Sequence, residues 1–78
     1  MTKINDTTKI GQELRMRRQM AGITQQQIAN EHGMVYPTIR AAEQGKDVSM
    51  RTILAICESL KLRIRFEPYG EPTATSNI

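Results

Sequence analysis

The sequence feature that most constrains the fold is the stretch from Ile23 to Gly45, ITQQQIANEHGMVYPTIRAAEQG. Thr24 is a good helix N-cap, and Gln27 stands three residues later, where the second side chain of a capping box belongs. We therefore expect a short helix over about residues 24–32. Gly33 follows directly, and a glycine just past a helix end readily adopts the left-handed conformation that ends a helix. The chain should turn at this point.

A second helix is expected directly after the turn. Proline is tolerated in the first turn of a helix, because the N–H groups there have no acceptor within the helix and proline lacks this group. Pro37 therefore indicates that this helix begins near Val35 or Tyr36. Ile39 and Ala42 then lie on one face of it, three residues apart. The stretch thus predicts two short helices joined by a tight turn, and the second helix has only one apolar face.

This pattern resembles the helix-turn-helix of the phage Cro and repressor group, also called the Xre family. The resemblance rests on Gln25, Ala29, Gly33, Ile39, Ala42 and the ending Glu43, Gln44, Gly45. It is dense in this window and extends more loosely from about residue 10 to 60. It implies a mainly α, lambda-repressor-like domain of four to five helices. The alternative is an ordinary helical hairpin with a glycine turn.

Composition supports a single small domain. A chain of 78 residues is near the lower limit at which one hydrophobic core suffices. Cys57 is the only cysteine, which excludes an internal disulfide, and we expect it to be a small core residue. The absence of a signal peptide and of a long apolar run predicts a cytoplasmic protein without membrane contact. The net charge of +3 is compatible with a polyanionic partner but is weak evidence alone.

The residues before the motif predict an arm and a packing helix. Residues 1–7 are polar and are expected to form a flexible arm, followed by a domain over residues 8–61. Ile10 and Leu14 lie on one helical stripe, and Gly22 should end that helix. Arg15 and Arg17 of this helix are expected to form a solvated face, and for Arg18 the solvated face is the alternative to an ion pair.

A last helix is expected after Ser49, which is a good N-cap residue. Its broad apolar face should close the core, and the helix should end near Leu60 or Lys61. This face comprises Ile53, Leu54, Ile56, Cys57 and Leu60. His32, the only histidine, is expected to be a solvated helix-end residue without a metal or catalytic role, because no second histidine or cysteine is near it.

The apolar period then changes from that of a helix to that of a strand. Leu62, Ile64 and Phe66 alternate with Arg63, Arg65 and Glu67. Such alternation is typical of a strand with one buried face and one solvent-exposed face. A lone strand needs a hydrogen-bonding partner, so we expect residues 62–67 of two copies to pair antiparallel in a homodimer. The alternative is that this segment continues the last helix.

Helices followed by a short C-terminal strand resemble the HipB-type antitoxins of the Xre group. The remaining residues, 68–78, are polar with two prolines and a glycine, and are expected to form a disordered tail.

The resemblance implies that the second helix of the motif enters the major groove of DNA, where all four base pairs differ. The base-reading positions carried over are Val35, Tyr36, Pro37, Arg40 and Ala41. We expect Arg40 to be the main specificity residue, because its planar fork of donors can bond O6 and N7 of guanine. The family usually has Ser, Thr or Gln at several of these positions. We therefore expect fewer direct hydrogen bonds to bases here, and a larger contribution of DNA shape to recognition.

A second set of residues is expected to hold phosphates and to position the protein without reading sequence. It comprises Thr24, Gln25, Thr38, Gln44 and Lys46, together with backbone N–H groups at the start of the first helix of the motif. For Lys46 the alternative is a free loop lysine. The resemblance also implies a largely buried ion pair between Arg18 and Glu43, which would fix geometry more than add stability.

These expectations describe a sequence-specific DNA-binding transcriptional regulator, a repressor of its own operon. A homodimer would present two recognition helices about 34 Å apart and bind an inverted repeat. The predicted C-terminal strand favours a narrower function, the antitoxin of a toxin–antitoxin pair, with a toxin protein as partner. A phage-type repressor or a restriction-modification controller could have the same helices.

The alternative of another class is a protein-interaction module that has lost DNA binding, and it is favoured by the apolar run Val35, Tyr36, Pro37. An enzyme is not expected, and neither is a cofactor or metal. One His, one Cys and scattered carboxylates assemble no acid, base and nucleophile set, and the sequence has no phosphate-cradling glycine loop.

Overall fold

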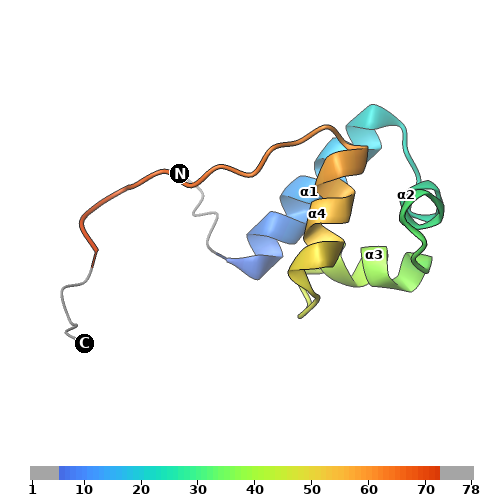
Figure 1. Ribbon diagram of the computed structural model, residues 1–78, viewed down its shortest axis with the longest axis horizontal. Coiled ribbons are helices and arrows are strands. Elements are labelled where there is room, and N and C mark those ends of the chain that lie inside the picture. The colour runs from blue at the N-terminus through green and yellow to red at the C-terminus, as the bar shows by residue number, and fades with distance from the viewer. Residues whose placement is uncertain (1–5, 73–78) are drawn as a thin grey trace.

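The computed structural model describes residues 6–72, and this part of the chain forms four helices (Figure 1). Their bounds are α1 Thr7–Ala21, α2 Gln25–His32, α3 Tyr36–Glu43 and α4 Met50–Ser59. The third helix packs against each of the other three. The predicted mainly α class is confirmed.

Local caps explain where the first two helices begin. The Oδ1 atom of Asp6 accepts a hydrogen bond of 2.8 Å from the N–H of Thr8, so α1 begins at Thr7, one residue earlier than predicted. Residues 1–5 of the predicted arm lie outside the described residues. At α2 both bonds of the capping box are present: Gln27 N–H donates to Thr24 Oγ1 at 3.0 Å, and Thr24 N–H donates to Gln27 Oε1 at 2.7 Å.

Two glycines end the helices of the motif. Gly33 has φ of 67° and its N–H bonds the Ala29 carbonyl, which gives the predicted turn between α2 and α3. Gly45 has φ of 78° after α3. A Cβ atom on Gly45 would lie 2.7 Å from the Cα of Thr8, so the left-handed conformation and the close approach to α1 both require glycine here.

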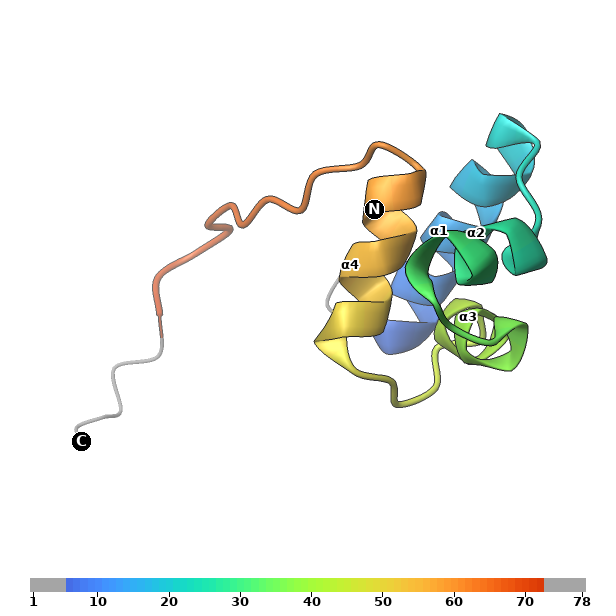
Figure 2. The same cartoon turned by 45° about the vertical axis from the view of Figure 1, so that its right-hand side comes forward.

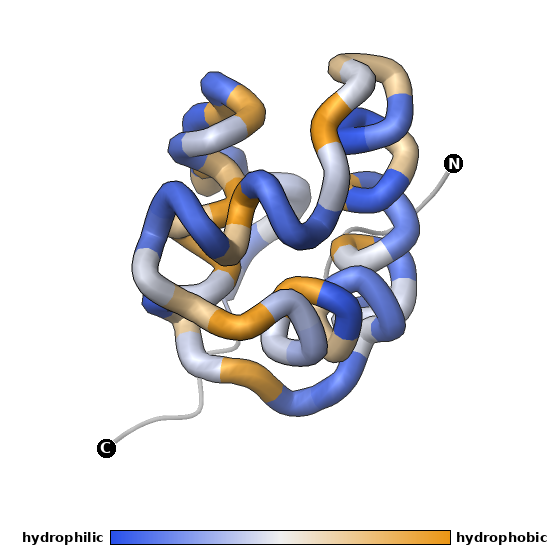
Figure 3. Tube along the Cα trace, turned by 90° about the vertical axis from the view of Figure 1, so that its right-hand side faces the viewer, coloured by the Kyte–Doolittle hydropathy of each residue, from blue (hydrophilic) through white to orange (hydrophobic). Residues whose placement is uncertain are grey.

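The core is built from all four helices. Its buried members are Leu14, Ile28, Ala29, Ile39, Ala42, Ile56 and Cys57. Figure 3 shows hydrophobic and hydrophilic residues alternating along the helical turns, as expected when each helix buries one face. Cys57 lies in the core as predicted, and burial raises the pKa of its thiol.

One residue predicted for the apolar face of α4 does not belong to it. Leu54 is 50% exposed, whereas Ile56 is fully buried. Each residue turns a helix by about 100°, so two residues place Leu54 about 200° around the helix from Ile56. The prediction that Leu54 closes the core is therefore wrong. Together with Met50, which is also exposed, it leaves apolar surface on the outer side of α4.

The last helix ends in a hydrogen-bonded turn without a glycine. Lys61 adopts a left-handed φ of 58°. Its N–H bonds the Glu58 carbonyl at 3.2 Å, and the N–H of Leu62 bonds the Cys57 carbonyl at 2.8 Å. These two bonds form a Schellman motif, and Leu62 then packs against the core. This turn excludes the alternative in which α4 continues through the next residues.

The segment after Leu62 runs away from the helices in both ribbon views (Figure 1 and Figure 2). Residues 62–68 form neither helix nor strand, and Phe66 is 92% exposed. Because a strand needs a second strand to bond with, pairing between two copies stays a prediction. Residues 68–72 are exposed coil, and the rest of the predicted tail, residues 73–78, lies outside the described residues.

No helix in the described part of the chain is both long and apolar enough to span a membrane.

Candidate nucleic-acid interface

The third helix has one face in the core and the other in solvent. Ile39 is fully buried and Ala42 nearly so, with 3% of its surface exposed. At the start of the helix the exposed fractions are 64% for the N-cap Val35 and 45% for Tyr36. Of the five predicted base-reading residues, Val35, Tyr36, Pro37 and Arg40 are exposed and Ala41 is half-buried. The structure therefore presents nearly the whole predicted set on one exposed helix.

The predicted partners Arg18 and Glu43 lie together in the structure. Arg18 Nε donates to Glu43 Oε2 at 2.5 Å, and Nη2 donates to Oε1 at 3.1 Å. The third guanidinium nitrogen, Nη1, donates to the Ile23 carbonyl at 2.9 Å. Only 12% of the Arg18 side chain and 2% of the Glu43 side chain are exposed. A bidentate pair of this kind joins α1 to the end of α3.

The sequence did not predict that Gln25 joins this pair. Its Nε2 donates to Glu43 Oε1 at 3.0 Å, so the carboxylate accepts hydrogen bonds from both α1 and α2. One carboxylate therefore connects α1, α2 and α3. An amide nitrogen has two hydrogens, so the second hydrogen of Gln25 Nε2 is not used by Glu43. A glutamine at the first position of a helix carried no sequence signal of this long-range contact.

An open depression lies between α1, α2 and α3. Its lining residues are Arg15, Arg18, Gln25, Arg40, Glu43 and Gln44. The structure thus brings together Gln25 and Gln44, predicted for phosphates, with Arg40, predicted for bases. Arg15 was expected on a solvated face, and the signal that could have placed it here is its spacing of three residues from Arg18, which puts both on one side of a helix.

The other predicted phosphate residues do not line this depression. Thr24 is exposed and its hydroxyl oxygen caps α2. Thr38 is half-buried in the first turn of α3. Lys46 is exposed in the loop after Gly45, and its N–H bonds the Ala41 carbonyl at 3.0 Å. These residues lie at the ends of α2 and α3 rather than in one pocket.

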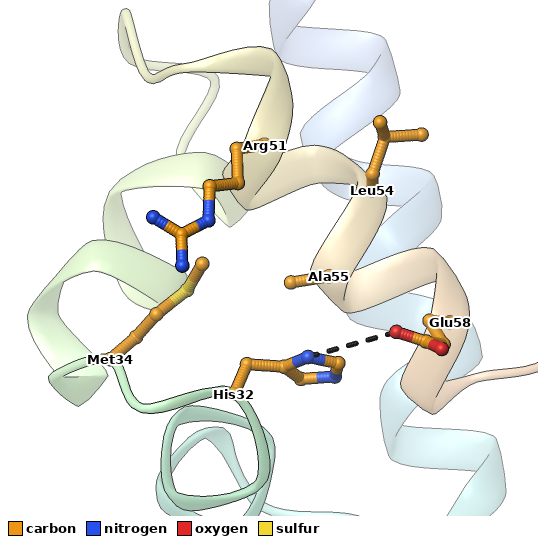
Figure 4. Close-up of a pocket in the computed structure, with 6 residues that line it drawn as sticks. All are labelled: His32, Met34, Arg51, Leu54, Ala55 and Glu58. Carbon is orange, nitrogen blue, oxygen red and sulfur yellow. Dashed lines mark ion pairs between the residues drawn. The ribbon is translucent and has the colours of Figure 1, made fainter.

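His32 is not the solvated residue that the sequence predicted. It lines a second pocket with Met34, Arg51, Leu54, Ala55 and Glu58, and Figure 4 shows its ring lying toward Glu58. Its side chain is only 15% exposed, and Nδ1 lies 3.8 Å from Glu58 Oε1. On the other side of the ring, Nε2 lies 2.9 Å from Ser59 Oγ. The prediction failed because helix α4, which covers the ring, comes from a distant part of the sequence.

Metal-ligating residues do not gather in groups of three or more anywhere among residues 6–72.

A protein-family model described as "Helix-turn-helix domain" matches residues 9–63. The chain belongs to this helix-turn-helix family. The motif consists of α2, the turn at Gly33 and α3, and the match also covers most of α1 and all of α4. A search of the curated proteins finds no matching relative.

Solved structures similar to this helix-turn-helix protein include HipB complexes. A chain of the structure described as "Structure of HipA-HipB-O2-O3 complex" is 27% identical, with a TM-score of 0.80 over 90% of this chain and 100% of that chain. A chain of "HipB-O4 20mer complex" is 25% identical with the same TM-score of 0.80 and the same coverage of 90% and 100%. "MDT Protein" matches equally, at 25% identity and a TM-score of 0.80, covering 90% and 100% of the two chains. The predicted resemblance to HipB is confirmed.

Proposed function

We propose that this helix-turn-helix protein is a sequence-specific DNA-binding regulator that represses its own operon as a homodimer. The observation that carries the proposal is the division of α3 into a face locked in the core and a face exposed to solvent. A helix fits the major groove, and a helix whose orientation is fixed by its own domain can present the same side chains to successive base pairs. No enzymatic activity forms part of this proposal, and the protein would act in the cytoplasm.

The exposed side chains of α3 divide by chemistry. Arg40 is proposed to bond a guanine edge, since a guanidinium fork matches O6 and N7. Val35 and the Pro37 ring would pack on thymine methyl groups, and the Tyr36 hydroxyl would bond a base or a phosphate. Around them, the predicted phosphate set of Thr24, Gln25, Thr38, Gln44 and Lys46 would fix the register of the protein on the duplex.

The proposed dimer rests on the segment after α4. Ile64 is 41% exposed and Phe66 is 92% exposed, and the charged residues between and beside them also face water. Pairing residues 62–67 with the same residues of a second copy would give their backbone groups partners and cover the apolar side chains. Two copies would present two recognition helices about one DNA turn apart, roughly 34 Å, and so bind an inverted repeat.

A narrower proposal concerns a protein partner. One similar structure contains HipB together with HipA. By analogy with that assembly, we propose that this protein is the antitoxin of a toxin–antitoxin pair and binds a HipA-like toxin. Co-expression with the product of the adjacent gene tests this, with co-elution as the expected result. Separate elution of the two proteins would contradict the antitoxin proposal while leaving DNA binding untouched.

The decisive experiment for DNA binding is selection of bound duplexes from a random pool. Enrichment of an inverted repeat is expected, and it would establish specificity and symmetry together. If no sequence is enriched, the rival function gains support, namely an interaction module that uses the exposed apolar side chains of Val35 and Tyr36. A capture experiment with wild type and a Tyr36→Ala variant would then examine that module.

A further inference from the structure

The depression between α1, α2 and α3 is lined by a charged side chain, Arg15, to which the proposed function gives no role. Arg15 is exposed on α1 and lines the depression together with Gln25, Arg40 and Gln44. The remaining lining residues, Arg18 and Glu43, form the buried ion pair. Because that pair is neutral as a unit, the depression keeps the positive charges of Arg15 and Arg40.

The arginines of α1 differ in their partners. Arg17 donates to Glu13 at 2.6 Å one turn away, and Arg18 pairs with Glu43. Arg15 forms no ion pair with any carboxylate among residues 6–72. Arg15 and Arg40 line the same depression and both are exposed, so the depression carries positive charge. Such a place attracts an anion from outside the protein.

Neutral donors surround the same place. The Nε2 atom of Gln25 uses one hydrogen for Glu43 and keeps the other. Thr24 accepts hydrogen bonds from the N–H of Gln27 through its hydroxyl oxygen and from the N–H of Ile28 through its carbonyl oxygen. In the described residues, the backbone N–H groups of Gln25 and Gln26 have no acceptor. The first N–H groups of a helix also carry positive partial charge. The Arg15 guanidinium group and these N–H donors match the oxygens of a phosphate group, and the charge of Arg40 adds to the positive potential.

We propose that this depression binds one backbone phosphate of the DNA duplex and that Arg15 is the α1 residue that holds it. The inference rests on the proposed function. Arg40 supports the choice of a backbone phosphate over a free one, because Arg40 lies both on the exposed face of α3 and in the lining of the depression. A duplex that receives α3 in its groove therefore brings its sugar–phosphate edge over Arg15.

Salt-dependent binding of two matched variants tests the inference. Arg15→Gln and Arg17→Gln each remove one charge from the same helix, but only Arg15 lines the depression. Arg15→Gln should weaken binding by about ten- to a hundredfold to both the selected duplex and a random one. It should also reduce the salt slope of log Kd by about one, as expected for one lost phosphate contact. Arg17→Gln should stay within about twofold of wild type. Equal effects of the two variants would overturn the inference.

Neutral phosphates locate the contact. We expect that, in a series of duplexes each carrying one methylphosphonate, substitution at one position lowers the affinity of wild type. The same substitution should not lower the affinity of Arg15→Gln, because the variant has already lost that contact. The absence of any such position would overturn the inference. Inorganic phosphate at about 10 mM should compete no better than an equal ionic strength of chloride. Stronger competition that disappears in Arg15→Gln would show a free-phosphate site instead, and would also overturn it.

These outcomes separate the inference from the proposed function. If wild type binds no duplex, the proposed function fails and takes the inference with it. If wild type binds the selected duplex with a steep salt dependence and Arg15→Gln behaves like wild type, the inference alone fails. Because Arg15 is exposed, the thermal unfolding of Arg15→Gln should match that of Arg17→Gln, which excludes misfolding as the cause of weak binding.

Discussion

At the scale of single residues, Glu43 connects three helices of the domain. Its carboxylate is almost fully buried and accepts hydrogen bonds from Arg18 on α1 and Gln25 on α2. Removing two charges from water costs several kcal/mol per ion, and their attraction offsets that cost only when the geometry is good. The pair therefore contributes more to orientation than to net stability.

Loss of one partner should nevertheless be severe. Glu43→Ala should lower the free energy of unfolding by about 3–5 kcal/mol, because it leaves the Arg18 guanidinium largely buried without a counter-charge. Urea denaturation followed by circular dichroism measures this change. The double variant Arg18→Met with Glu43→Leu should recover most of the loss, since it removes both charges. A Glu43→Ala loss below about 1 kcal/mol would contradict this account of the pair.

Arg40 should affect sequence discrimination rather than folding. Arg40→Ala should weaken binding to the selected duplex by about 1–3 kcal/mol, and binding to a random duplex much less. Fluorescence anisotropy with both duplexes measures the two effects. Arg51→Ala is a suitable control, because Arg51 is an exposed arginine on α4 that lines the other pocket. An equal loss on both duplexes would reassign Arg40 to the phosphate backbone.

At the scale of secondary-structure elements, the contact of α1 with α3 depends on Gly11. A Cβ atom there would lie 2.5 Å from the Glu43 carbonyl oxygen and 2.7 Å from that of Ala42. Both atoms are backbone at the end of α3, so they cannot move without shifting the helix. The two helices can therefore approach this closely only where α1 has no side chain.

Gly11→Ala should therefore destabilise the protein by about 1–3 kcal/mol, the usual loss for an overpacked core. Alanine alone would favour a helix by about 0.5–1 kcal/mol over glycine, so a loss identifies the clash with α3. Thermal unfolding of Gly11→Ala measures it, with Gln12→Ala on the exposed side of α1 as the control. Unchanged or increased stability of Gly11→Ala would mean that α1 and α3 separate easily.

The sequence predicted the elements well where their signals are local. The capping box at Thr24, the left-handed glycine at Gly33 and the cap at Ser49 each involve residues within four positions, and the structure places helix ends beside all three. The left-handed Lys61 was missed because the residue type gave no sign of it. Gly11 was missed as well, because a glycine inside a helix shows its purpose only when another helix lies against it.

The candidate site was predictable only in part, for the same reason. Helical periodicity predicts the buried face of α3, with Ile39 and Ala42, whereas Tyr36 and Arg40 were named from the resemblance to the Xre family. The hydrogen bond from Gln25 to Glu43 and the packing of His32 against Ser59 join residues far apart in the chain. The side chain of Arg15 reaches the depression only because α1 crosses near α3. Such contacts depend on how helices pack, which periodicity does not specify.

At the scale of the whole molecule, the described residues form a compact helical part and an extended C-terminal segment (Figure 2). Leu62 belongs to the first, since it packs against the core. Ile64 and Phe66 belong to the second and leave apolar surface in water. The stability of the domain and the association of two copies should therefore be separable.

Removing residues 63–78 should give a folded monomer, because the deletion spares Leu62 and the four described helices. Sedimentation velocity measures the oligomeric state, and circular dichroism checks the helices. The control is removal of residues 69–78, which keeps the whole predicted strand and should leave the dimer intact. A dimer that survives the longer deletion would place the subunit contact elsewhere.

The shared hydrogen bonding of Gln25 has a consequence for how tightly such a protein can hold DNA. Because Glu43 already fixes one hydrogen of the amide, the direction of the other is set before any duplex arrives. The rotamer entropy of this side chain is then lost during folding instead of during association. Releasing the amide, as Glu43→Ala would do, should therefore slow or weaken complex formation even on molecules that remain folded.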